Sequence, residues 1–266
     1  MNFQPKLKEV EMKNMVKNIC AAMVISLCAA GHLSATENNP NNDNKFMEEN
    51  LNLTQEWDKT FPQSDKVNHK KITFHNRYGI TLAADLYVPK NVTGKLPAIA
   101  ISGPFGAVKE QASGLYAQTL AERGFLTIAF DPSYTGESSG QPRYVASPDI
   151  NTEDFSAAVD YLSTRDDVDA ERIGILGICG WGGMALNAAA IDTRIKATVT
   201  ATMYDMSRVN ANGYFDSMNA DARHELRRQL NAQRTEDYRN GTFALGAGVV
   251  DPLPAAATQL VKAYHA

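Results

Sequence analysis

The chain has 266 residues, with 26 basic and 30 acidic side chains and a formal net charge of -4. This small acidic excess gives no electrostatic footprint for nucleic acid or for an anionic membrane surface. Apolar residues make up 44% of the chain, which is enough for a packed core and excludes global disorder. Three cysteines are too few for a disulfide framework, and five histidines without paired cysteines predict no metal site.

The first 35 residues have the layout of a secretory signal peptide. A short basic start at 12–18 precedes the uncharged apolar run Ile19 to Ala30, and small and then polar residues follow. We expect cleavage after Ala30 or Ala35, export to the periplasm or outside the cell, and no membrane attachment afterwards. The alternative is a buried helix, which the run's all-round apolarity disfavours. Residues 36–66, rich in Asn, Glu and Lys, predict a flexible segment.

From residue 67 onward, strand and helix patterns alternate. A hairpin is predicted at 67–74 and 80–88, and apolar strands at 98–101, 125–130, 173–177 and 195–202. Helices are predicted at 110–123, from Asn151 or Thr152 to Thr164, and at 182–190. This order implies a mostly parallel sheet covered on both faces. Ligands of such sheets bind at the carboxyl ends of the strands.

The segment Gly177-Ile178-Cys179-Gly180-Trp181-Gly182-Gly183 lies between a predicted strand and a predicted helix. This is the context of a nucleophile elbow, in which Cys179 takes the nucleophile position and the Gly180 amide is one oxyanion donor. The second donor is expected from the loop after the third strand, at Phe105 or Gly106, because Pro104 has no amide hydrogen. Trp181 stands where the usual elbow has a small residue.

Two other interpretations of this segment remain open. Cys179 is also compatible with an ordinary buried cysteine. The run from Gly180 to Ala185 fits the G-x-G-x-x-A dinucleotide fingerprint, and Asp205 follows at about the expected distance of 20 residues. That fingerprint normally opens a domain after its first strand, whereas this run follows the fifth, which favours the elbow.

Five segments in chain order carry a family resemblance: ITLAADLYVP, AIAISGPFGAVKEQ, FDPSYTGESSG, DVDAERIGILGICGWGG and IKATVTATMYDM. Over residues 67–205 the chain resembles an α/β-hydrolase of the dienelactone-hydrolase and X-Pro-dipeptidyl-peptidase-like group. The resemblance implies a three-layer α/β-hydrolase-type sandwich that needs no cofactor. It also implies that Cys179 attacks an ester, thioester or amide bond of a small-molecule acyl substrate.

The resemblance further implies eight strands, with an acid after the seventh and a histidine after the eighth. We find six strands, followed at 206–266 by a helical cap fragment with helices at 218–239 and 255–264. We therefore expect a chain that is truncated relative to the family. Asp205, after the sixth strand, is the substitute candidate for the acid. The histidines from which a base would have to come are poorly placed in the pattern: His69, His75, His224 and His265.

The remaining expectations concern the surroundings of the elbow. We expect Trp181, Tyr134 and Tyr204 to line a substrate pocket, and Asp131 to hold the loop after the fourth strand through backbone hydrogen bonds. Missing strands would leave one side of the sheet open, which favours a homodimer through that side. Three functions compete: an exported hydrolase, a catalytically incomplete member that at most binds a ligand, and a dinucleotide-dependent oxidoreductase.

Overall fold

The structure is a computed structural model that describes residues 49–203 and 205–244. The predicted signal peptide, Tyr204, His265 and the predicted helix at 255–264 lie outside the described residues. Six strands are present: β1 (Val67–His75), β2 (Thr81–Pro89), β3 (Leu96–Ser102), β4 (Leu126–Phe130), β5 (Val168–Ile178) and β6 (Ile195–Ala201). No helix within the described ranges has the length and apolarity that a membrane crossing requires.

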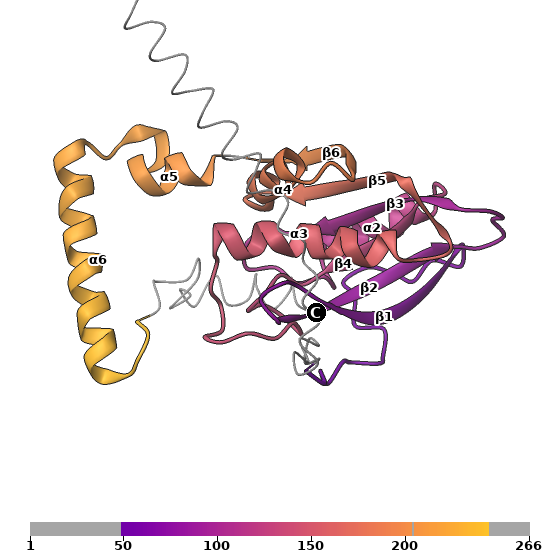
Figure 1. Cartoon of the computed structure of the whole chain (residues 1–266), viewed down its shortest axis with the longest axis horizontal. Coiled ribbons are helices and arrows are strands. Elements are labelled where there is room, and N and C mark those ends of the chain that lie inside the picture. Colours follow the sequence, from indigo (N-terminus) through magenta and orange to yellow (C-terminus); the bar gives the residue numbers. More distant parts are fainter. Residues whose placement is uncertain (1–48, 204, 245–266) are drawn as a thin grey trace, which may run out of the picture. The chain divides into compact units, whose positions relative to one another are not determined.

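The strands form one sheet in the order β1-β2-β4-β3-β5-β6 (Figure 1). β1 pairs with β2 and β2 with β4 in antiparallel register, whereas the pairs β4–β3, β3–β5 and β5–β6 are parallel. The predicted mostly parallel sheet is thus confirmed. β5 starts earlier than its apolar pattern indicates, because Val168 pairs with Leu96 ahead of a bulge.

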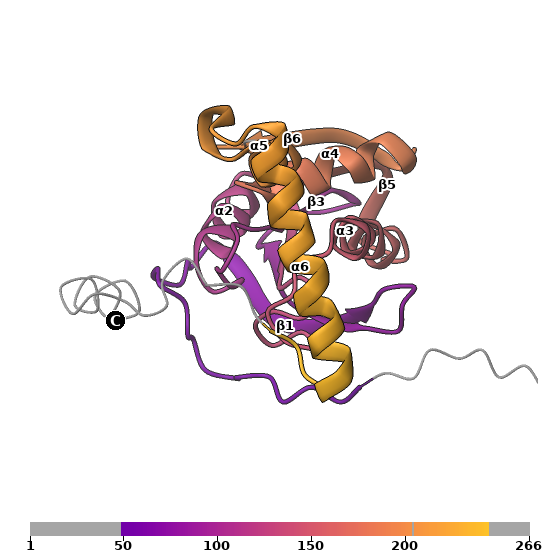
Figure 2. The same cartoon turned by 90° about the vertical axis from the view of Figure 1, so that its left-hand side faces the viewer.

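Helices cover both faces of the sheet, which makes the fold a three-layer sandwich. α2 (Ala112–Ala121) lies on one face, and α3 (Pro148–Ser163) and α4 (Trp181–Ile191) lie on the other (Figure 2). Ala117 and Ala121 of α2 pack with Ile101 and Leu176 of the sheet. The larger apolar cluster joins the opposite face to α3 and α4, with Phe155 and Leu162 fully buried.

α3 begins earlier than predicted. Ser147 is its N-cap, with a side chain that accepts a hydrogen bond from the Ile150 amide, so the prediction of Asn151 or Thr152 was wrong. Pro148 follows as the first helical residue, where the missing amide hydrogen costs nothing and the fixed φ favours a helix. Asn151 instead lies inside the helix, fully buried, and donates to Asp154.

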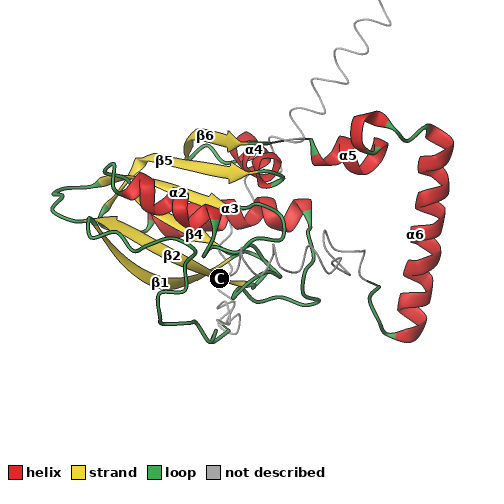
Figure 3. Cartoon of the chain, turned by 180° about the vertical axis from the view of Figure 1, so that it is seen from behind, coloured by secondary structure: helices red, strands yellow, loops and turns green. Residues whose placement is uncertain are grey.

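Two segments flank the sandwich in sequence. Residues 49–66 form neither helix nor strand, yet Phe61 is buried and the Thr60 amide donates to the Glu110 carbonyl at 3.1 Å. After β6 the chain is helical: α5 (Met206–Asn212), the 3-10 turn η2 (Tyr214–Asp216) and α6 (Ala220–Asn240), coloured red in Figure 3. None of the residues in these three elements is buried.

Candidate active site

Cys179 lies at the turn between β5 and α4. β5 ends at Ile178 and α4 begins at Trp181, so Cys179 and Gly180 alone connect them. The φ of Cys179 is +58°, in the left-handed region that costs a non-glycine residue about 1 to 2 kcal/mol. The turn is held by hydrogen bonds from the Cys179 amide to Ala201 O (2.9 Å) and from the Gly182 amide to Cys179 O (3.0 Å). A half-buried free thiol therefore stands at a strained strand-to-helix tip, the geometry of an elbow.

The glycine before this tip lets α4 start directly above the end of β5. A Cβ built on Gly177 would overlap the Trp181 carbonyl and lie 2.8 Å from Gly182 Cα. These neighbours are backbone atoms, which cannot move aside without shifting the helix. Close passage of strand and helix at this point depends on the missing side chain.

Three backbone amides around the elbow have no hydrogen-bond partner among the described residues. They belong to Phe105 and Gly106, in the loop after β3, and to Gly180, which is buried at the N-terminus of α4. The Phe105 ring joins the two groups: it covers Gly180 and meets the Trp181 ring edge-on, with centroids 4.3 Å apart. Buried amides are nearly always paired, and of the three residues only Gly180 is buried, whereas Phe105 is half-buried and Gly106 is exposed. The three free donors together suit an oxygen that develops negative charge.

A cavity of about 290 Å³ opens beside the elbow. Its walls are mostly apolar and come from the loops after β3 and β4 and from α4: Phe105, Val108, Pro132, Tyr144, Val145 and Trp181. Arg143 also lies on the wall, but its guanidinium donates to the carbonyl oxygens of Ser138 and Gly136. Of the residues expected to line a substrate pocket, Trp181 lies on this wall, whereas Tyr134 is not part of the lining and packs its ring on Gly140.

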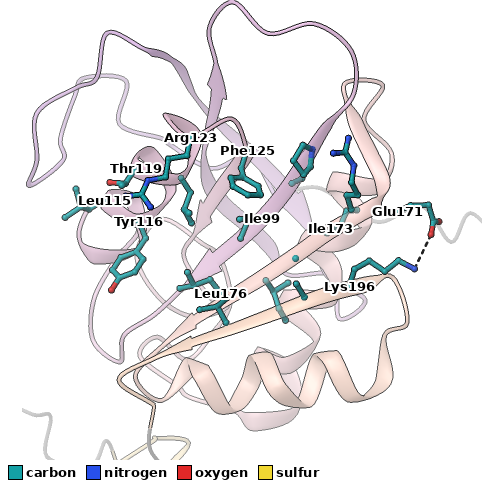
Figure 4. Close-up of a pocket in the computed structure, with 18 residues that line it drawn as sticks. Ile99, Leu115, Tyr116, Thr119, Arg123, Phe125, Glu171, Ile173, Leu176 and Lys196 are labelled. Atoms are coloured by element: carbon teal, nitrogen blue, oxygen red, sulfur yellow. Dashed lines mark ion pairs between the residues drawn. The ribbon is translucent and has the colours of Figure 1, made fainter.

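A larger hollow of about 680 Å³ lies elsewhere, along the face of β3, β5 and β6 beside α2 (Figure 4). Apolar side chains form its floor and one wall: Ile99, Leu115, Phe125, Ile173, Leu176 and Val199. The ion pair between Lys196 and Glu171, 3.2 Å apart, marks its rim. Neither Cys179 nor any residue that carries a free amide lines this sheet-face hollow. The smaller cavity is lined by Phe105 and Gly106, though not by Cys179 or Gly180, and is therefore the better candidate for acyl chemistry.

Asp205 is engaged as the N-cap of α5. Its carboxylate caps α5 by accepting hydrogen bonds from the Ser207 hydroxyl (2.6 Å) and the Arg208 amide (2.9 Å), and these bonds lower the pKa of Asp205. Cys179 Sγ forms no hydrogen bond within residues 49–203 and 205–244. On β1, His69 Nε2 lies 2.8 Å from Asp85 Oδ1, and His224 is exposed on α6. Neither His69 nor His224 is therefore paired with the cysteine.

A buried group of charges next to the site was not predicted. We call it the lysine–carboxylate cluster, and it consists of Lys59, Lys71, Lys109, Asp58, Asp85, Glu110, Asp131 and Glu137. One feature of the sequence is consistent with this cluster, because charged residues follow both β3 and β4. These two strands are neighbours in the sheet, which brings the charged residues together. Asp131 does hold the loop after β4, as predicted, because its Oδ2 accepts from the Glu137 amide at 2.9 Å.

Ion pairing and burial oppose each other in this cluster, and burial prevails at Asp131, whose pKa it raises. Burial opposes the charge of Lys109, but Asp131 and Glu110 raise the pKa of its ammonium well above the usual range. Glu137 is also partly desolvated, yet hydrogen bonds from Lys109, the Thr54 amide and Lys71 lower its pKa to about 2. Lys109 and Glu137 are thus ionised at neutral pH. Removing one member would leave an uncompensated buried charge, which costs about 3 to 5 kcal/mol. Within the described ranges, no group of three or more His, Cys, Asp or Glu side chains is arranged to hold a metal ion.

The parallel sheet, the strand-to-helix elbow and the donors beside it define an α/β-hydrolase-type fold. An α/β hydrolase from Penicillium shares this fold, with a TM-score of 0.58 and 21% identity over 73% of this chain and 65% of that one. Residues 78–259 match the family model for the X-Pro dipeptidyl-peptidase (S15 family). The chain belongs to this S15 family of α/β hydrolases.

A bacterial relative with a high sequence identity and a fungal relative with a lower one illustrate the similarity to known proteins. An uncharacterized Pseudomonas aeruginosa protein is 63% identical over 225 residues, which are 84% of this chain and 60% of the relative. The crystal structure of a hypothetical protein of that organism superposes with a TM-score of 0.72 at 65% identity, covering 77% of this chain and 67% of that one. A thiohydrolase from Aspergillus aculeatus is 29% identical over 137 residues, 52% of this chain and 42% of the relative. The chain thus spans well under two thirds of the length of both curated relatives.

Proposed function

We propose that the protein is an exported hydrolase that cleaves an ester, thioester or amide bond of a small-molecule acyl substrate, with Cys179 as the nucleophile. The observation that carries this proposal is the left-handed backbone of Cys179 at a strand-to-helix turn, next to three amides without partners. Strain of this kind persists where the surrounding structure enforces it, and it concentrates at reactive sites. Export rests on the signal-peptide layout of the first 35 residues.

The proposed reaction has two balanced steps. The Cys179 thiolate adds to the acyl carbon, and the carbonyl oxygen becomes an oxyanion that accepts hydrogen bonds from the amides of Gly180 and of Phe105 or Gly106. Collapse breaks the bond to the leaving alcohol, thiol or amine, which takes up a proton, and a thioester remains on Cys179. Water then hydrolyses this thioester, releasing a carboxylic acid and restoring the thiol.

The cavity beside the elbow favours an uncharged acyl group. Its lining is largely aromatic and aliphatic, and the one cationic side chain on its wall is committed to two loop carbonyls. Similarity to a thiohydrolase over half of the chain supports the thioester as the bond to test first. A nucleic-acid or membrane partner has no support in the charge balance of the chain.

A test measures how fast the Cys179 thiol is acylated, relative to glutathione, with alkylation as the reference reaction of the thiol. Wild-type chain is treated with a butyryl thioester of N-acetylcysteamine or with iodoacetamide, and mass spectrometry of peptides assigns the label. We expect Cys179 to be acylated at least about a hundredfold faster than glutathione, since one good oxyanion donor is worth that much. Cys179→Ala should abolish the label. Acylation no faster than that of glutathione would exclude the proposed function.

A second candidate is binding of an acyl ligand without turnover. It is favoured by the capping role of Asp205 and by the lack of a histidine bonded to Cys179 among the residues described. The same thioester separates the two candidates. A hydrolase releases acid continuously in excess of the protein, whereas a binding protein either accumulates one acyl group per Cys179 or takes up none.

A further inference from the structure

The loop that carries the free Phe105 and Gly106 amides is short and is anchored at both ends. At its start, a Cβ on Gly103 would overlap the Ile178 carbonyl and lie 2.8 Å from Trp181 Cβ, so this residue rests directly on the elbow. At its end lies Lys109, whose side chain is completely buried. Between the anchors, a turn is closed from the Ala107 amide to Pro104 O at 3.2 Å. Val108 is also bonded to Gln111, just before α2: its amide donates to Gln111 Oε1 at 3.2 Å, and its carbonyl accepts from the Gln111 amide at 3.0 Å.

Lys109 attaches the far end of this loop to the neighbouring strand. Its backbone amide donates to Asp131 Oδ1 at 2.8 Å, and its ammonium donates to Asp131 Oδ2, also at 2.8 Å. Asp131 follows β4 immediately and is itself fully buried. The same ammonium donates to Glu137 Oε2 at 2.7 Å, in the loop after β4. One residue thereby fixes the backbone of the donor loop in two directions.

We propose that Lys109 is a positioning residue, which holds the Phe105 and Gly106 amides toward a carbonyl oxygen bound at Cys179. This inference rests on the proposed function and adds to it a residue outside the acyl site. Lys109 does not touch the thiol; it acts through the backbone between itself and Gly103. Without its side chain the loop keeps the contact with the elbow at Gly103 and the backbone bond from the Lys109 amide to Asp131, but it loses the ammonium bonds to Asp131 and Glu137.

The same cluster supplies a matched control. Lys59 is also completely buried as a side chain, and its ammonium lies 2.6 Å from Asp58 and 3.0 Å from Asp85. It makes no contact with Asp131 among the described residues. Lys59→Met therefore removes a buried lysine charge from the cluster, as Lys109→Met does, but leaves the anchor of the donor loop in place.

The experiment compares two reactions of Cys179 in the full chain. Acylation by the butyryl thioester builds an oxyanion, whereas alkylation by iodoacetamide does not, so a misplaced donor loop slows only the first. We expect Lys109→Met to slow acylation at least about tenfold while alkylation changes less than about twofold. Asp131→Asn, which removes the charge facing the Lys109 ammonium but leaves its bond to Glu137, should give a smaller loss with the same selectivity. Lys59→Met should leave the ratio of the two rates unchanged.

Each result bears on the inference. It is overturned if Lys109→Met acylates at the wild-type rate, if both reactions slow together, or if Lys59→Met shows the same selective loss. If Lys109→Met does not fold, the ratio measured in Asp131→Asn decides, and an unchanged ratio overturns the inference. Wild-type acylation no faster than that of glutathione overturns the proposed function itself, and the role of Lys109 with it; this outcome is recognisable before any variant is made.

Discussion

Cys179 adopts a backbone conformation that its own side chain disfavours. Its φ of +58° is one that glycine adopts freely and other residues adopt at a cost. Selection for stability alone would place glycine at this position. A cysteine at this strained position implies that its thiol has a function that offsets the cost of the backbone strain.

This strain predicts that a stabilising substitution exists at the site. Cys179→Gly should be more stable to urea than Cys179→Ala by about 0.5 to 1 kcal/mol, because relief of the left-handed strain exceeds the extra entropy of an unfolded glycine. Both variants lose the half-buried thiol, so comparing them with each other removes that contribution. A Cys179→Gly protein that unfolds at a lower urea concentration than Cys179→Ala would contradict the strained geometry.

Single residues also show where sequence reasoning succeeds and where it stops. The position of Cys179 at a strand-to-helix turn follows from local patterns, since an apolar strand and a small-residue helix flank it. The capping role of Asp205 could not be predicted, because the polar residues that follow it show no clear helical periodicity and so did not indicate that a helix begins there. The contacts of Lys109 depend on Asp131, which only the order of β3 and β4 in the sheet brings close.

At the level of elements, the junction of β5 and α4 is the tightest contact near the site. Gly177 faces the backbone of Trp181 and Gly182, whereas a Cβ on Gly183, in the first turn of α4, would meet no atom within 4 Å. The two glycines therefore differ in their surroundings: a side chain at residue 177 would clash with backbone atoms, whereas one at residue 183 would not. Only the first is needed for the strand and the helix to approach.

Alanine substitutions at these two positions should have opposite effects. Gly177→Ala should lower the free energy of unfolding by about 3 kcal/mol or more, because rigid backbone atoms must move. Gly183→Ala should raise it by about 0.5 to 1 kcal/mol through helix propensity. Chemical denaturation measures both. Equal effects of the two substitutions would mean that α4 does not start against the end of β5.

The elements themselves were largely predictable because apolar alternation and helix-stop glycines are local signals. β1, β2, β3, β4 and β6 were each predicted to within a few residues. The start of α3 was missed because the cap lies at Ser147, before the apolar period begins, and the early start of β5 was missed because its pairing with β3 is long-range. The contacts of residues 49–66 are likewise long-range, so composition alone indicated only a flexible segment.

In the whole described molecule, helices cover the two faces of the sheet unequally. α3 and α4 cover one face, whereas α2 covers only part of the other and leaves the sheet-face hollow. β6 pairs only with β5, and its Val199 is 53% exposed. Exposed edge strands with apolar surface beside them favour pairing with another chain. The Lys196–Glu171 pair places one charge of each sign at the rim, which is compatible with a self-complementary interface.

We propose that two copies associate through this side of the sheet. Sedimentation velocity should detect a dimer of wild-type chain at micromolar concentration. Val199→Glu should weaken the dimer at least about tenfold, because a charge would enter a dry interface. Ile191→Glu is the control, since Ile191 is 74% exposed at the end of α4 and lies outside the hollow. A monomeric wild type, or equal loss in both variants, would rule out this interface.

The contact between Phe105 and Gly180 restricts how this site can evolve. The Phe105 ring fills the space where a side chain on residue 180 would stand. The Trp181 ring packs against the Phe105 ring and prevents it from moving to that side. A lineage that gains any side chain at position 180 must first shrink residue 105, and a lineage that keeps the large ring must keep the glycine. Substitutions at these two sites should therefore occur jointly along the branches of the family tree, even though many residues separate them in the chain.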